Sequence, residues 1–143
     1  MEYKHAAKIQ LRFVDTDMLG HINNAYFLTY MEVARMSYLT EVLGDSVDWK
    51  REGIILAKAE VEYKIPVFIE DDLYVEIRVE QISSKSFLIT YRFVKRNLPH
   101  HPVAATGSTL MVCYDYAENK SIVMPQAWRE RIVHYEPHLS ASI

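Results

Sequence analysis

The sequence predicts an α+β fold in which one long central helix is wrapped by a curved five-stranded antiparallel sheet. The segment 25–43 is apolar around most of a helical circumference, which is typical of a buried helix. One segment before it and four segments after it have the residue pattern of strands, and short polar turns separate the last four. In a chain of 143 residues, only these strands can cover so apolar a helix.

The first predicted strand spans 4–14. Ile9, Leu11 and Phe13 alternate there with polar side chains, so one face of the strand is expected to be buried. A polar break at 15–21 separates this strand from the helix.

The helix is predicted to begin next to Asn23 and Asn24, whose side-chain oxygens can cap free backbone N–H groups. Gly44 stands where the helix should end, because glycine readily adopts the conformation that closes a helix. Glu32 and Arg35 belong to the narrow polar stripe of the helix and are predicted to pair across one turn.

Four predicted strands after the helix supply the rest of the sheet. They span 54–66, 72–83, 87–96 and 103–116, and a short helix at 126–133 follows Pro125. Consecutive strands joined by short turns predict an antiparallel meander. Exposed sheet edges commonly pair with another copy of the chain, so we expect a homodimer or a homotetramer.

Composition and charge exclude several classes of protein. The net charge is −3 and the pI is about 6.1, so we expect no nucleic-acid partner. The sequence has no apolar run of bilayer length and no signal-peptide core, so we expect a cytoplasmic protein without membrane insertion. The four glycines are too scattered for a phosphate-binding loop. Cys113, the only cysteine, cannot form an internal disulfide and is expected to be a small core residue.

The segment 15–24 carries the candidate chemistry, because acidic residues and a glycine stand directly before a helix start. A helix N-terminus presents free N–H groups and a partial positive charge, which can polarise a carbonyl oxygen. A carboxylate held nearby can attack an activated acyl carbon, or it can take a proton from a water that attacks. Asp15 and Asp17 are the two carboxylates of this segment, and such aspartates often only cap a turn.

This segment resembles the signature of the hotdog-fold acyl-CoA thioesterases of the 4-hydroxybenzoyl-CoA thioesterase superfamily. The signature residues matched here are Asp17, Gly20, Tyr30, Glu32 and Arg35. The resemblance continues along nearly the whole chain through Tyr63, Pro66-Val67, Asp72, Ser86-Phe87, Ala105, Gly107, Tyr114-Asp115 and Pro125. It implies one hotdog thioesterase domain over residues 1–143, which hydrolyses a fatty-acyl or aromatic acyl-CoA thioester.

The resemblance also implies a role for individual residues. Asp17 is the implied catalytic carboxylate, as nucleophile or as general base, and Asp15 is expected to be structural. The backbone N–H groups of Asn23 and Asn24 would polarise the thioester. The substrate pocket would be lined by His21, Tyr26, Phe27 and Tyr30. No set of side chains has metal-ligand spacing, and thioester hydrolysis needs only an activated attacker and a stabilised oxyanion, so we expect no metal and no organic cofactor.

Three other functions are compatible with such a fold. The acyl group can be carried by an acyl-carrier protein instead of coenzyme A. A hotdog hydratase needs an Asp-x-Asn-Pro-x-His motif, which is absent between Asp17 and His21. A non-catalytic acyl-binding module would not need the carboxylate before the helix.

Overall fold

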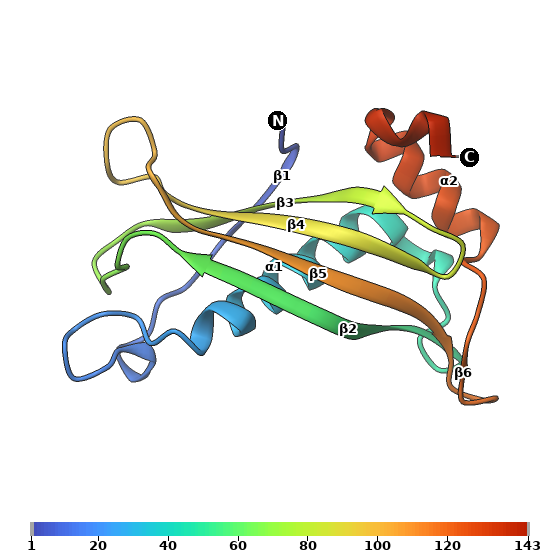
Figure 1. Cartoon of the computed structure of the whole chain (residues 1–143), viewed down its shortest axis with the longest axis horizontal. Coiled ribbons are helices and arrows are strands. Elements are labelled where there is room, and N and C mark those ends of the chain that lie inside the picture. Colours follow the sequence, from blue (N-terminus) through green and yellow to red (C-terminus); the bar gives the residue numbers. More distant parts are fainter. Residues whose placement is uncertain (1, 143) are drawn as a thin grey trace.

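The computed structural model describes residues 2–142 and shows one long helix lying against a curved antiparallel sheet (Figure 1). The elements are β1 (His5–Lys8), α1 (Tyr26–Leu43), β2 (Glu52–Tyr63), β3 (Leu73–Ile82), β4 (Ser86–Lys95), β5 (Val103–Asp115), β6 (Lys120–Ser121) and α2 (Gln126–Tyr135). Short 3-10 turns lie at Phe13–Asp15, Gly44–Ser46 and Pro137–Ser142. The predicted arrangement of a central helix and an antiparallel sheet is therefore confirmed.

The strands lie in the order β1-β3-β4-β5-β2, and the two-residue β6 pairs with β5. The predicted meander is correct for β3, β4 and β5, but it is wrong for β2, which pairs with β5 from Glu52 opposite Asp115 to Tyr63 opposite Ala105. The physical reason is the segment 64–72, which is long enough to carry the chain across the sheet, whereas only short turns join β3 to β4 and β4 to β5. β2 therefore ends the sheet at the edge opposite β1.

The core lies between α1 and the inner face of the sheet. Met31, Tyr38 and Leu43 of α1 are completely buried there. Gly107 of β5 permits this contact, because a Cβ at that position would lie only 3.1 Å from the Cε of Met31 and 3.0 Å from the Glu60 carbonyl oxygen. None of the helices within residues 2–142 has the length and apolar character needed to cross a bilayer.

The first strand is shorter than predicted. Pairing with β3 ends close to the Ile9 N–H, which donates to the Leu73 carbonyl at 2.9 Å, because β3 itself begins at Leu73. Beyond this point the alternating pattern has no partner strand. Phe13, which was expected on the buried face, is 83% exposed in a 3-10 turn.

Both ends of α1 lie close to their predicted positions, but the capping at its start differs. The N-cap position is Ala25 and has no side-chain cap, so the predicted capping by Asn23 and Asn24 is wrong in detail. The Asn23 Oδ1 instead accepts the Ala25 N–H at 3.0 Å, which forms a turn just outside the helix. The helix ends at Leu43, and Gly44, with a φ of +53°, is its C-cap residue, as predicted.

The predicted pairing of Glu32 with Arg35 is also wrong. Arg35 is buried and donates to the Tyr91 hydroxyl at 3.1 Å, whereas Glu32 is exposed. Tyr91 in turn shares a 2.6 Å hydrogen bond with Thr109, so the guanidinium contacts a pair of hydroxyl groups inside the sheet. Arg35 thus lies on the face of α1 that packs against β4 and β5.

Candidate active site

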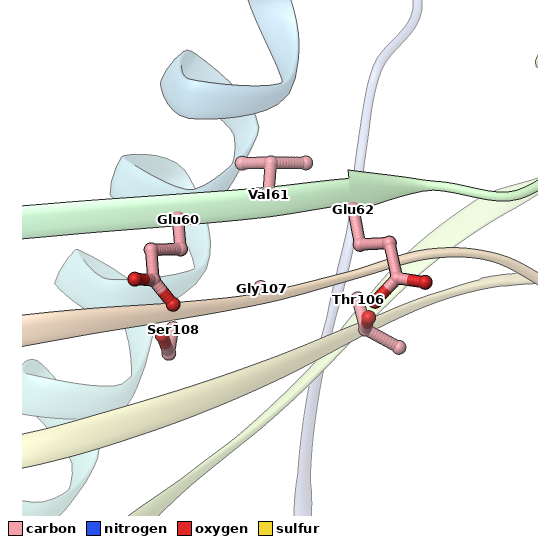
Figure 2. Close-up of a pocket in the computed structure, with 6 residues that line it drawn as sticks. All are labelled: Glu60, Val61, Glu62, Thr106, Gly107 and Ser108. Atoms are coloured by element: carbon pink, nitrogen blue, oxygen red, sulfur yellow. The ribbon is translucent and has the colours of Figure 1, made fainter.

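The structure has two hollows that bear on function, and the larger is the less suited to chemistry. It has a volume of about 530 Å³ and lies over β2 and β5. Figure 2 shows the side chains of Glu60, Glu62, Thr106 and Ser108 on one side of the strands, while Val61 points the other way. Glu60 is paired with Lys58 of β2, and Glu62 is paired with Lys64, which directly follows β2. All of its lining residues belong to β2 and β5, so no helix N-terminus borders this hollow to polarise a substrate carbonyl.

The second hollow is a cleft of about 180 Å³ beside the N-terminal end of α1. One wall comes from the loop before α1 and its first turn, and the other comes from the end of β2 and the residues after it (Figure 1). The lining residues are Asp17, His21, Ile22, Asn24, Phe27, Tyr63, Lys64, Ile65, Pro66 and Val67. The other lining residues of the cleft, besides Asp17, His21, Asn24 and Lys64, are apolar or aromatic, as acyl-binding sites require.

Asp17 lies half-buried in this cleft, and one of its carboxylate oxygens accepts hydrogen bonds from the loop. Its Oδ1 accepts the Leu19 N–H at 2.9 Å and the His21 N–H at 3.1 Å. The turn between them needs Gly20, whose φ is +81°. Within the described chain, Oδ2 has no hydrogen-bond partner. The loop therefore fixes the carboxylate and leaves one oxygen available to react.

Asp15, two positions earlier, is completely buried and fully hydrogen-bonded. Its Oδ1 accepts from Arg12 at 3.1 and 2.8 Å, and its Oδ2 accepts the Tyr30 hydroxyl at 2.6 Å. Burial alone would raise the pKa of Asp15, but the hydrogen bonds from Tyr30 and Arg12 outweigh it and lower that pKa. Asp15 is thus an ionised internal anchor for the loop.

The two backbone donors that the resemblance implied differ in this structure. The Asn23 N–H donates to the Asp15 carbonyl at 2.8 Å. The Asn24 N–H donates to no acceptor within residues 2–142, and Asn24 lines the cleft. Asn24 is therefore the better placed of the two to polarise a carbonyl oxygen.

The four implied pocket residues also separate into two pairs. His21 and Phe27 line the cleft. Tyr30 instead buries its hydroxyl against Asp15, and this burial together with the adjacent carboxylate raises the pKa of Tyr30. Tyr26 stacks on Tyr30, with ring centroids 6.5 Å apart, and lies outside the cleft lining.

The second wall of the cleft, residues 63–67, was not assigned a role from the sequence. The Ile22 N–H donates to the Val67 carbonyl at 2.7 Å, and the rings of His21 and Phe68 meet edge to face at 5.1 Å. These contacts join the wall to the loop that carries Asp17. The Tyr63-x-x-Pro66-Val67 pattern was the available signal, but a pattern does not show which distant loop it touches.

A buried ion pair holds this wall in place. The Lys95 ammonium lies 3.0 Å from the Asp71 Oδ2 and donates to the Pro66 carbonyl at 2.6 Å, and both charged side chains are nearly buried. Asp71 also accepts the Phe68 N–H at 2.8 Å. Burial alone would raise the pKa of Asp71, but the hydrogen bonds from the Phe68 N–H, Asn97 and Lys95, together with the Lys95 charge, outweigh it and lower that pKa, so the carboxylate stays ionised.

Cys113 is not among the residues that line this cleft. Cys113 is buried in β5 as expected, and burial raises the pKa of its thiol to about 12. In the part of the chain that the structure describes, no group of three His, Cys, Asp or Glu side chains is arranged to hold a metal ion.

A curved antiparallel sheet around one long helix is the arrangement of the hotdog fold, which solved thioesterase structures share with this chain. The sequence profile of the Thioesterase-like superfamily matches residues 11–132, and the chain belongs to this family. The predicted hotdog fold is thereby confirmed.

Individual relatives agree with this assignment. A thioesterase of Thermus thermophilus, whose crystal structure contains coenzyme A and zinc, superimposes with a TM-score of 0.82 at 29% identity, over 94% of this chain and 96% of that one. The long-chain acyl-CoA thioesterase FadM of Escherichia coli is 24% identical over 87% of this chain and 94% of its own length. A 1,4-dihydroxy-2-naphthoyl-CoA hydrolase of Picosynechococcus is 26% identical, with 77% and 76% covered.

Proposed function

We propose that this protein is an acyl-CoA thioesterase that converts a fatty-acyl or aromatic acyl-CoA to the free acid and coenzyme A. The observation that carries the proposal is a cleft that contains two groups without a hydrogen-bond partner among residues 2–142. These are the Oδ2 atom of Asp17 and the backbone N–H of Asn24. The thioesterase family of the chain and the coenzyme A bound to the Thermus relative support it.

In the proposed reaction, the thioester carbonyl oxygen accepts the Asn24 N–H, and the positive end of the α1 dipole stabilises the developing oxyanion. Asp17 then acts in one of two ways. As nucleophile, its Oδ2 bonds to the acyl carbon, the carbon–sulfur bond breaks, and water hydrolyses the resulting anhydride. As general base, it takes a proton from the water whose oxygen adds to the acyl carbon. In both routes the sulfur leaves as a thiolate, which then takes a proton.

A single turnover in ¹⁸O-labelled water identifies the nucleophilic route when water opens the anhydride at the aspartyl carbon. In that case the label enters the Asp17 carboxylate and the product acid carries an unlabelled oxygen from the enzyme, whereas opening at the acyl carbon labels only the product, as water activation does. Water activation places one labelled oxygen in every product molecule and none in the enzyme. Peptide mass spectrometry of Asp17 and of the product acid reads out both quantities.

The acyl group is proposed to lie against the apolar part of the cleft, formed by Ile22, Phe27, Ile65 and Val67. FadM acts on long-chain acyl-CoA and the Picosynechococcus enzyme on an aromatic acyl-CoA, so both classes belong in the test. A thiol-release panel would compare fatty-acyl chains of increasing length, aromatic acyl-CoA esters, and the same acyl groups on acyl-carrier protein. Faster turnover on the carrier protein would favour the alternative carrier. Absence of release from every ester would contradict the proposal.

We further propose that the protein works as a homodimer, or as a homotetramer of such dimers, joined along β2. Within residues 2–142, β2 has a neighbour only on the β5 side, and its central residues are exposed. Leu28, Val33 and Met36 of α1 are also about half-exposed, as are Ile55 and Leu56 of β2. Strand pairing would satisfy the free edge and cover apolar surface together. A monomeric mass at micromolar concentration would contradict this assembly.

A further inference from the structure

Tyr63 connects the sheet to the start of the helix. It is the last residue of β2, and its hydroxyl donates to the Asn24 carbonyl at 2.9 Å. Its ring meets the Phe27 ring edge to face, with centroids 5.1 Å apart. Tyr63, Asn24 and Phe27 all line the cleft that contains Asp17. One side chain of the sheet thus contacts both the first turn of α1 and the candidate oxyanion donor.

We propose that Tyr63 is a positioning residue of the reaction, which orients the Asn24 backbone so that its N–H points at the substrate carbonyl. The inference rests on the proposed function, because it assigns a purpose to Tyr63 only if the Asn24 N–H polarises a thioester. Tyr63 itself acts through Asn24 and not on the reacting atoms.

The start of α1 needs such support. Among residues 2–142, no side chain caps this helix, and the only other hydrogen bond to the Asn24 carbonyl comes from the Phe27 N–H at 3.2 Å. The Tyr63 hydroxyl, at 2.9 Å, makes the shorter bond. A backbone donor contributes to catalysis only when it is held in place before the reaction. The Asn24 carbonyl belongs to the peptide group that follows the Asn24 Cα, so holding this carbonyl restrains the Cα to which the N–H group is joined.

The backbone at Tyr63 is held in place by the sheet. It pairs with Ala105 at the end of the long β2–β5 ladder, and the N–H groups of the next two residues, Lys64 and Ile65, both donate to the Ala104 carbonyl at 2.9 and 3.1 Å. The edge-to-face contact with Phe27 limits rotation of the ring, although Tyr63 is 46% exposed. The sheet can therefore set the position of the hydroxyl.

The test compares two variants that each remove one hydroxyl from the β2–β5 region. Tyr63→Phe keeps the ring on Phe27 and deletes only the bond to Asn24. Tyr114→Phe is the matched control, because Tyr114 lies opposite Gly53 near the other end of the same ladder and contacts only Tyr116 among the aromatic rings of the described chain. Steady-state thiol release gives kcat and KM for both. The ¹³C resonance of the Asn24 carbonyl in labelled protein reports the hydrogen bond without any substrate.

For Tyr63→Phe we expect kcat to fall about three- to tenfold, as for loss of one neutral hydrogen bond, with KM within about twofold of wild type. The Asn24 carbonyl resonance should move upfield, and Tyr114→Phe should change neither quantity. A merely structural role would lower the melting temperature without separating kcat from KM.

Two results would overturn the proposal. An unmoved Asn24 resonance would mean that Tyr63 does not hold this peptide, and an unchanged kcat with a moved resonance would mean that its orientation does not affect the reaction. Failure of the proposed function looks different, because the wild-type chain itself would then release no thiol, and the resonance would still decide whether Tyr63 holds Asn24.

Discussion

Asp15 and Asp17 are the same residue type two positions apart, yet the fold uses them in opposite ways. Asp15 is completely buried, and both of its carboxylate oxygens accept hydrogen bonds. Asp17 is half-buried in a cleft, and only its Oδ1 is engaged by the loop. The difference teaches that unused hydrogen-bonding capacity beside a cavity, more than carboxylate chemistry alone, distinguishes a candidate catalyst from an anchor.

The burial of Asp15 is possible because its charge is compensated locally. A buried carboxylate without partners would cost several kcal/mol and would instead become protonated. The Arg12 guanidinium and the Tyr30 hydroxyl prevent this, although the Arg12 side chain itself is more than half exposed. The Asp15 carbonyl also accepts the Asn23 N–H, so this residue fixes the backbone that leads into α1.

The largest expected effect comes from Asp17→Asn. The amide keeps an oxygen that can accept the Leu19 and His21 N–H groups, so the loop should keep its shape. The variant lacks a nucleophile and a base, so we expect kcat for thiol release to fall at least about 100-fold, comparable to loss of an oxyanion donor. The melting temperature should stay close to that of the wild type. Near wild-type turnover would mean that Asp17 is not the essential carboxylate.

Asp15→Asn should show the reverse pattern. The new amide places an N–H₂ group toward either Arg12 or Tyr30 and leaves a buried polar group imperfectly paired. We expect the free energy of unfolding in urea to fall by about 1–3 kcal/mol, while the folded protein keeps most of its activity. If Asp15→Asn abolishes turnover in folded protein and Asp17→Asn does not, the roles of the two aspartates are exchanged.

The pH dependence of stability sharpens the comparison further. The folded pKa of Asp15 is lowered, so its contribution to stability is present above the unfolded pKa of about 4 and is lost as pH falls through the lower folded pKa. Wild-type stability should therefore decline more steeply than that of Asp15→Asn below about pH 4. Urea unfolding of both proteins between pH 3 and 6 measures this difference, since Asp71, which is shifted in the same direction, is common to both. Parallel curves would show that Asp15 does not carry a lowered pKa.

Tyr30→Phe isolates one bond of the Asp15 cluster. The variant removes the hydroxyl that donates to Asp15 at 2.6 Å and keeps the buried ring. Loss of a buried hydrogen bond to a charged group should lower the free energy of unfolding by about 1–2 kcal/mol. Because Tyr30 does not line the cleft, KM should change little. A large rise in KM without loss of stability would instead support the pocket role that the family resemblance implied.

Much of the fold was predictable because it depends on local residue patterns. The helix at 26–43 is a long, mostly apolar segment that stops before a glycine, and the strands β3, β4 and β5 contain apolar residues with the alternating spacing of a strand. The position of β2 was not predictable, since strand order depends on a long connection whose path no local pattern encodes. The early end of β1 has the same origin, because it follows from where β3 begins.

In the candidate site, too, residues close together in the sequence were predictable, whereas contacts between distant residues were not. Asp17, His21 and Asn24 stand in one short motif, so the sequence could place them together at the start of the helix. Tyr63 reaches Asn24 across 39 positions, and that contact depends on the strand order of the sheet. The bond between Tyr30 and Asp15 was equally hidden, because Tyr30 matches the family signature whether it faces substrate or an internal carboxylate.

The smallest expected effect belongs to Arg12→Gln. The Arg12 side chain is 57% exposed in the wild type, so water and salt screen much of its electrostatic attraction to Asp15. Its two hydrogen bonds to the Asp15 Oδ1 are present beside this attraction. Removing it leaves Asp15 with the Tyr30 hydroxyl and lets water approach the vacated Oδ1. We therefore expect a decrease in melting temperature smaller than that of Tyr30→Phe, and smaller still in 1 M salt. A decrease as large as that of Asp15→Asn would show that the exposed guanidinium, and not the buried hydroxyl, holds the anchor in its ionised form.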